Sequence, residues 1–253
     1  MALGTQPVGK LLDYEQYIDH QIRRTRTRIK MTDVLTALVL LGTVAIGVPF
    51  VLTLYAQQVL GYSALKFGVS SVVLAVGATA GAIAGQAALG KAGFRSAAAT
   101  GMALMGAGSL VLAQVSASGN YFPDIFFGLL LCGLGIGLAF VTATVAALSG
   151  VAGHESGLAS GLSNTALQIG TALGVAIVST VAVSRSADYL AANTGANPLV
   201  VLTEGYQSAF VACAVLAGIG LALALLFPGR FPGRPRKARQ EHLDLAPATS
   251  ARD

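Results

Sequence analysis

Long apolar stretches without charge alternate with short polar segments along this chain. Each stretch holds at least 19 residues free of Asp, Glu, Lys and Arg, and about 20 apolar residues in a helix cross the hydrocarbon core of a bilayer. Helices buried in soluble domains are rarely this long or this free of charge. The pattern predicts an all-α membrane protein with six transmembrane helices, at Val34–Val59, Phe67–Gly90, Ala97–Val115, Ile125–Gly150, Gly157–Ser184 and Tyr206–Phe227.

The segments before and after the six spans are polar and basic. In residues 1–33 apolar positions recur at helical spacing, and a cluster of Arg and Lys follows at 23–30. This pattern favours a basic amphipathic helix lying on the inner membrane surface, with a plain solvated run of charge as the alternative. We therefore expect an amphipathic segment at 1–33, a six-span domain at 34–227 and a basic, disordered cytoplasmic tail at 228–253.

Composition agrees with a membrane protein and excludes several other classes. Only 11% of residues are charged and the mean hydropathy is +0.70, whereas soluble domains carry about 25% charged residues. The net charge of +5 lies in loops and tails, so anionic lipid explains it better than nucleic acid does. Cys132 and Cys213 fall inside apolar stretches and are interpreted as small core residues rather than a disulfide or metal ligands. No cofactor is expected.

Lys and Arg are distributed unevenly between the two sides of the membrane. An even number of spans places both termini on one side, where loops and tails carry 14 of the 16 Lys and Arg residues. The other side carries only Lys66 and Arg185. Because loops rich in Lys and Arg stay in the cytoplasm, we expect a multi-pass protein of the cell membrane with both termini cytoplasmic.

The spans divide into two sets of three that share short sequence matches. Gly47–Val51 in the first span is similar to Gly137–Val141 in the fourth, and Gly77–Gly81 in the second is similar to Gly170–Gly174 in the fifth. Three is an odd number, so a repeated unit of three spans is inverted in the membrane, as in many secondary transporters. The matches predict a 3+3 inverted repeat, with chance similarity between Gly- and Ala-rich segments as the alternative.

Small residues recur within several spans at the spacing that allows helix backbones to approach closely. They predict helix contacts in the second and fifth spans, although glycine is frequent throughout the chain. The expected packing positions are Gly77, Gly81, Gly85, Gly157, Gly161, Gly170 and Gly174.

Two segments with a characteristic order of residues stand at the ends of spans. Leu54–Ala64 leaves the first span, and Gly157–Thr165 opens the fifth, followed by Gln168-Ile169-Gly170 and Ala172-Leu173-Gly174. Both resemble the C-terminal half of major facilitator superfamily transporters, most closely the fourteen-span drug:proton antiporters. The resemblance covers all six spans and implies a secondary active, proton-coupled transporter of the multidrug efflux type.

The loop after the second span departs from the family's signature, Gly-x-x-x-Asp-Arg-x-Gly-Arg-Lys. In that register Gly90 replaces the Asp and Lys91 replaces the first Arg, while Gly93 and Arg95 keep the small and basic character of the loop. The acidic gating partner is thus missing, which puts a charge-relay role of this loop in doubt.

A complete family member has twelve or fourteen spans, so the resemblance implies that this chain corresponds to one half. The spans contain no carboxylate, although intramembrane carboxylates are the usual proton relays. The chain is interpreted as a gene fragment, one half of a split transporter or a half that assembles with a second copy. We therefore expect an N-terminal transporter half or a second copy as a partner.

Uncharged polar side chains within the spans are the candidates to line a path for a small hydrophobic or amphiphilic substrate. Tyr55 and Gln58 share a face of the first span, and Asn164, Gln168 and Thr171 share a face of the fifth; Thr142 lies in the fourth. Each of them has an alternative role as a hydrogen bond between helices. A membrane module that regulates or stabilises another membrane protein is the alternative function. An enzyme is not expected, because the spans lack a His, Asp or Glu cluster.

Overall fold

The computed structural model describes residues 8–91, 93–117, 125–149, 151 and 153–226, with only the backbone for residues 8–31, 33 and 154. These residues form helices joined by short turns. In chain order the elements are α1 (Val8–Gln58), α2 (Ala64–Ser70), α3 (Val72–Lys91), α4 (Gly93–Leu112), α5 (Phe127–Leu148), the 3-10 turn η2 (Gly153–Glu155), α6 (Ser156–Ala192) and α7 (Pro198–Leu226).

Five stretches within the described helices are long and apolar enough to cross a membrane. They are Val34–Gln58 of α1, α2 together with α3, and the whole of α5, α6 and α7. The helix expected as the third span, α4, has 20 residues with Arg95 in its first turn, and it packs against α5 and α7 inside the bundle. The fold is therefore a membrane-type helical bundle with five strongly apolar helices and α4 as a sixth member.

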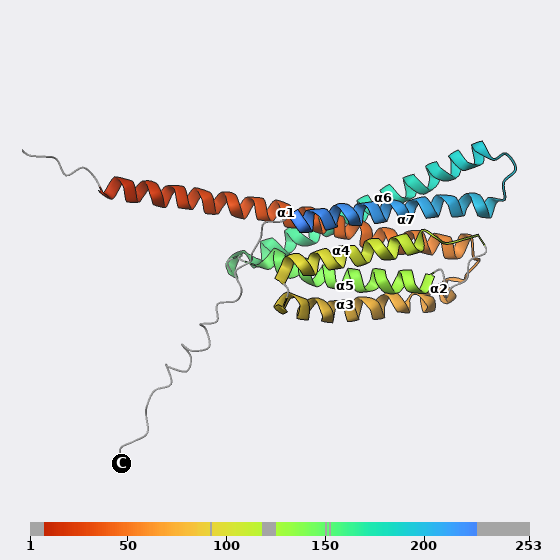
Figure 1. The fold of residues 1–253 in the computed structure, drawn as a ribbon, viewed down its shortest axis with the longest axis horizontal. Helices are drawn as coiled ribbons and strands as arrows, with labels where there is room; N and C mark the ends of the chain where they lie inside the picture. The colour runs from red at the N-terminus through yellow and green to blue at the C-terminus, as the bar shows by residue number, and fades with distance from the viewer. Residues whose placement is uncertain (1–7, 92, 118–124, 150, 152, 227–253) are drawn as a thin grey trace, which may run out of the picture.

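The helices run up and down in two groups that meet along α4 and α7 (Figure 1). One group contains α1, α6 and α7, and the other contains α3, α4 and α5. Val34 and Leu223 lie near each other across the bundle, so α7 finishes at the end where the apolar part of α1 begins. We call this the Val34 end and the opposite one the Gln58 end.

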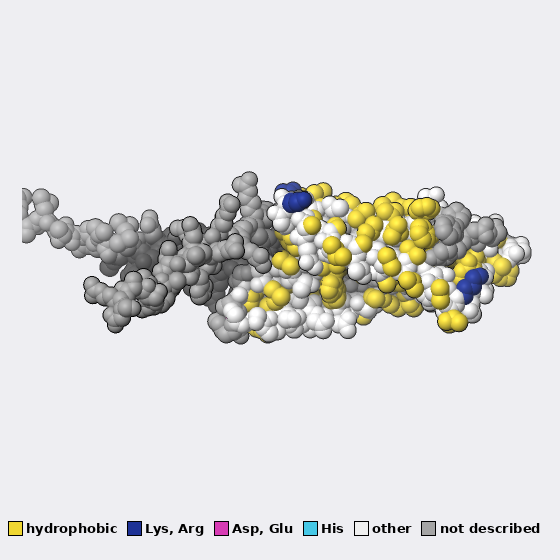
Figure 2. Space-filling view, turned by 90° about the horizontal axis from the view of Figure 1, so that it is seen from below, with side chains coloured by type: hydrophobic (Ala, Val, Ile, Leu, Met, Phe, Trp, Pro, Cys, Tyr) yellow, Lys and Arg dark blue, Asp and Glu magenta, His cyan; other side chains and the backbone are white. Residues whose placement is uncertain are grey.

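Apolar side chains from α1, α4, α5 and α7 fill the centre of the bundle. The largest fully buried side chains include Tyr55, Leu52, Met105 and Phe210. On the face shown in Figure 2, the dark-blue Lys and Arg side chains lie toward the two ends, and yellow hydrophobic side chains, interspersed with white atoms, lie between them. Such an apolar belt between charged ends suits a bilayer.

Glycines bring two pairs of helices into backbone contact. On α3, a side chain at Gly81 would collide with the backbone of Leu134 of α5, and side chains at Gly77 or Gly85 would be in tight contact with the α5 backbone. On α6, side chains at Gly170 or Gly174 would collide with Val39 and Thr43 of α1. Close approach of this kind holds helices by dispersion where lipid gives no hydrophobic drive.

Gly157 and Gly161 do not pack as expected from their spacing. Both are exposed, and nothing lies within 4 Å of the place where a Cβ would stand. The first turns of α6 lie at the margin of the bundle, so these two glycines face away from the other described helices.

The basic N-terminal segment continues the first span as a single helix. From Val8 the backbone of α1 runs without interruption to Gln58, and its first part leaves the bundle along the direction of the span (Figure 1). A helix lying on the membrane surface would need a bend before Val34. The amphipathic, surface-bound form stays a prediction, and the tail at 228–253 lies outside the described residues.

Candidate functional site

The exposed side of α6 carries two different stripes of side chains. One stripe is small and polar and contains Gly157, Gly161, Asn164, Gln168 and Ala172, all exposed and three or four residues apart. We call it the polar stripe. The other stripe, about a quarter-turn away, is large and apolar and consists of Leu158, Leu162, Ile169 and Leu173.

The two stripes suit different surroundings. The side chains of Leu158 and Ile169 are 75% and 51% exposed. Exposure of such apolar side chains to lipid tails carries no free-energy penalty. Asn164 and Gln168 make no hydrogen bond within the part of the chain that the structure describes, and a bare amide in hydrocarbon is costly. The polar stripe therefore favours water or another polar protein surface, and it is the best candidate site on the described surface.

Thr171, the third residue expected on this face, turns partly toward α1. It is half-buried and its hydroxyl donates to the Leu167 carbonyl of its own helix at 3.0 Å. Next to it, the buried hydroxyl of Thr43 lies 2.8 Å from Val39 O and 3.0 Å from Gly170 O on α6. Thr43 thus links α1 to α6 at a packing glycine. Sequence reasoning missed this residue, although a hydroxyl in an apolar span was a signal.

Tyr55 and Gln58 lie together at the Gln58 end, but only one of them is accessible. Tyr55 is fully buried, and its hydroxyl donates to Ser116 O at 2.7 Å. Gln58 is exposed, and its Oε1 accepts a hydrogen bond from Tyr206 at 2.7 Å. Tyr55 therefore supports helix packing in this structure, while Gln58 can reach a ligand.

The polar candidates do not converge on one place. Gly42 of α1 lies against Leu167 and Thr171, and Gln58 follows it by 16 residues, roughly 24 Å along a helix. The amides of the polar stripe are thus far from Gln58. Thr142 is fully buried in α5 and donates to Leu138 O of its own helix, so it does not face an open path either.

The basic turn between α3 and α4 lies at the Val34 end. Gly90, Lys91 and Arg95 are exposed around it. Gly93 has φ +82° as it opens α4, a backbone conformation that other residues adopt only with strain. The turn explains the need for this glycine, and it leaves both cations accessible to solvent or lipid headgroups.

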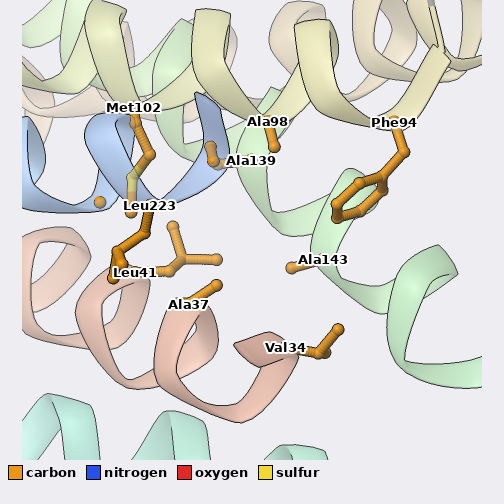
Figure 3. A pocket seen from close by; sticks show the side chains of 11 residues that line it. Val34, Ala37, Leu41, Phe94, Ala98, Met102, Ala139, Ala143 and Leu223 are labelled. Atoms are coloured by element: carbon orange, nitrogen blue, oxygen red, sulfur yellow. The ribbon is translucent and has the colours of Figure 1, made fainter. Parts of the chain in front are cut away.

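A small apolar cavity lies between α1, α4, α5 and α7 at the Val34 end (Figure 3). Its volume is about 40 Å³, and a single water needs about 10–15 Å³ of this kind of space. Alanine side chains such as Ala37, Ala98 and Ala143 leave it open. Drug sites are larger and carry polar groups that orient the ligand, so this space is a packing void rather than a substrate site.

Among the residues that the structure describes, no three His, Cys, Asp or Glu side chains are grouped so that they could hold a metal ion. Cys132 and Cys213 are both buried and unpaired. The site is thus defined by amides and small residues.

Comparisons with known proteins agree on one family. The sequence profile of the Major Facilitator Superfamily matches residues 10–175. The chain is 34% identical over 188 residues to the puromycin resistance protein pur8 of Streptomyces alboniger, covering 71% of this chain and 36% of that protein. It is 33% identical to the cephamycin export protein CmcT of Amycolatopsis lactamdurans, covering 76% of this chain and 37% of that protein. It thus spans little more than a third of these relatives.

A solved structure agrees with the fold. The crystal structure of a D-xylose-proton symporter superposes with a TM-score of 0.55 at 18% identity, covering 85% of this chain and 51% of that one. At this identity the likeness concerns the arrangement of helices alone.

Proposed function

The chain belongs to the major facilitator superfamily, in a branch with drug-export proteins, and from this premise we propose that it is the C-terminal half of a proton-coupled exporter of drugs or other small molecules. It is a transporter component rather than an enzyme. The observation that carries the proposal is its similarity to two antibiotic-export proteins, of which it covers little more than a third.

The exposed amides of α6 support the need for a partner. A membrane protein with a complete surface would turn Leu or Ile toward lipid, as the apolar stripe of α6 does. The polar stripe instead suits a second six-span bundle or the water-filled path between two bundles. We assign this face to an N-terminal transporter half, with a second copy of this chain as the competing occupant.

The glycine contacts also support the 3+3 inverted repeat. In such a repeat α1, α3 and α4 correspond to α5, α6 and α7. Because α3 corresponds to α6 and α5 to α1, a contact of α3 with α5 should have a counterpart between α6 and α1. Glycines of α3 do contact α5, and glycines of α6 contact α1. The two groups of helices in Figure 1 are likewise exchanged by it.

The positions of the acidic residues bear on proton coupling. Within the described residues Asp33 directly precedes the apolar part of α1, Glu155 precedes α6, Asp188 lies near the end of α6 and Glu204 in the second turn of α7. A proton relay needs a carboxylate within the membrane. We propose that the partner half supplies it and that this chain supplies the amide-lined side of the path.

Cells that lack drug exporters test the function. We expect the chain co-expressed with the N-terminal part of the puromycin resistance protein to lower puromycin accumulation at least several-fold, whereas the chain alone does not. The double variant Asn164→Leu/Gln168→Leu should abolish the effect. Ile169→Leu, which alters the neighbouring apolar stripe, is the matched control and should keep it. No export with this or any other supplied N-terminal half would favour a non-transporting membrane module.

Orientation is a separate prediction. The 14-to-2 division of Lys and Arg places both termini in the cytoplasm, so the C-terminal residue of α6 and the turn after it should be outside. In intact cells a membrane-impermeant maleimide should label Asn193→Cys and not Arg236→Cys. Labelling of the tail position with intact membranes would reverse the assignment.

A further inference from the structure

The chain that leaves α4 at the Gln58 end has backbone carbonyls that receive no hydrogen bond from a backbone N–H of α4. The helix ends at Leu112, and a tight turn follows in which Val115 N donates to Leu112 O at 3.4 Å. Beyond this turn the carbonyls of Val115 and Ser116 have no partner within α4. A buried carbonyl without a donor is costly, most of all in a membrane protein.

Side chains from two other helices donate to these carbonyls. Gln207 of α7 donates through Nε2 to Val115 O at 2.6 Å. Tyr55 of α1 donates through its hydroxyl to Ser116 O at 2.7 Å. Val115 and Tyr55 are completely buried, whereas Ser116 is exposed and Gln207 half-buried. Water therefore reaches the Val115 carbonyl only when the bundle opens.

Tyr206 connects the two donors. It precedes Gln207 on α7, and its ring meets that of Tyr55 edge-on, with centroids 6.5 Å apart and an interplanar angle of 81°. Its hydroxyl donates to Gln58 Oε1 at 2.7 Å. Edge-to-face tyrosines pack favourably. Side chains of α1 and α7 therefore contact each other and also bind the chain at the end of α4.

We infer that Tyr55, Tyr206 and Gln207 form a latch that fixes the end of α4 between α1 and α7 at the Gln58 end. The packing of α3 on α5 and of α6 on α1 relies on glycine contacts, with Thr43 as the added hydrogen bond between α1 and α6. Ser186 of α6 also donates to Val201 O of α7 at 3.1 Å. Glycine contacts let helices slide, whereas the latch holds specific atoms together. At this end α1, α4 and α7 therefore move as one body.

All contacts of the latch lie within this chain, so the proposal can be tested on the purified chain in mild detergent, without a transport assay. Val115→Cys places a thiol at a fully buried position next to one latch acceptor. We expect slow maleimide labelling of this thiol, and labelling at least ten-fold faster when Tyr55→Phe and Gln207→Leu are added. Tyr189→Phe, which removes a hydroxyl on α6 that takes no part in the latch, is the control and should leave the rate unchanged.

Cys132 and Cys213 are buried and report on the rest of the bundle. Mass spectrometry of the labelled peptides should find them unmodified while position 115 reacts. Equal rates with and without the latch residues would overturn the proposal. So would labelling of all three cysteines at one rate, because the chain after α4 would then open only with the whole bundle. Gln207→Leu alone, which keeps Tyr55, repeats the comparison in a less perturbed protein and should raise the rate to an intermediate value.

Discussion

Reconstituted alone in liposomes with an imposed pH gradient, the chain is expected to give no drug uptake above that of empty liposomes. Alternating access moves one six-span bundle against another around a site at the membrane midplane, and a single bundle has no counterpart. The described acidic residues also lie outside the long charge-free stretches, away from the usual position of a proton relay.

The measurement is uptake of a fluorescent lipophilic cation, with a full-length relative in the same lipid as the positive control. Addition of an N-terminal half should restore uptake by at least ten-fold. Robust proton-driven uptake by this chain alone would contradict both the half-transporter function and the assignment of the proton relay to a partner. Glu155 or Glu204 would then be the residues to examine.

Gly81→Leu is expected to be among the most damaging substitutions at the helix contacts of the described chain. A Cβ at this position already collides with the backbone of Leu134, and backbone cannot rotate away as a side chain can. Overpacking costs about 1–3 kcal/mol and occasionally more, so we expect a loss near the upper limit. Folded yield and apparent melting temperature in mild detergent are the measurements.

Gly161→Leu is the matched comparison for Gly81→Leu. Its surroundings are open within the described chain, and Leu is the better helix former by roughly 0.8 kcal/mol. The isolated variant should therefore keep the melting temperature of the unmodified chain, while pairing with an N-terminal half should weaken, because Gly161 lies in the polar stripe. An equal loss of folded protein in both variants would show that glycine spacing alone decides helix packing here.

The spans themselves were predictable because length and absence of charge are local properties of the sequence. In place of the expected second span, Phe67–Gly90, the structure has two helices, α2 and α3. The short helix α2 is capped by the hydroxyl of Ser63. The third span differs more from its expected bounds, because α4 begins at Gly93 rather than Ala97 and includes Arg95. Its place between α5 and α7 depends on partners that its own sequence does not reveal.

Which side of a helix meets which neighbour was much harder to predict. Gly81 and Gly161 have the same four-residue spacing to other glycines, yet one touches a backbone and the other touches nothing. Tyr55 and Gln58 lie three residues apart, yet one is fully buried and the other exposed. Helical periodicity gives the angle between two side chains, but the direction of the bundle centre comes from the other helices.

The pairing of α6 with α1 also affects the order in which the bundle can form during synthesis. Thr43 and Gly170, which meet between these helices, are 127 residues apart. When α1 enters the membrane, the surface that will cover its glycine Gly42 has not yet been translated. Contacts this distant in the chain form late, so this face of α1 stays in contact with lipid or the insertion machinery until α6 is synthesised. A chain interrupted before α6 would leave that face of α1 uncovered and open to capture by other membrane helices or by quality-control proteases.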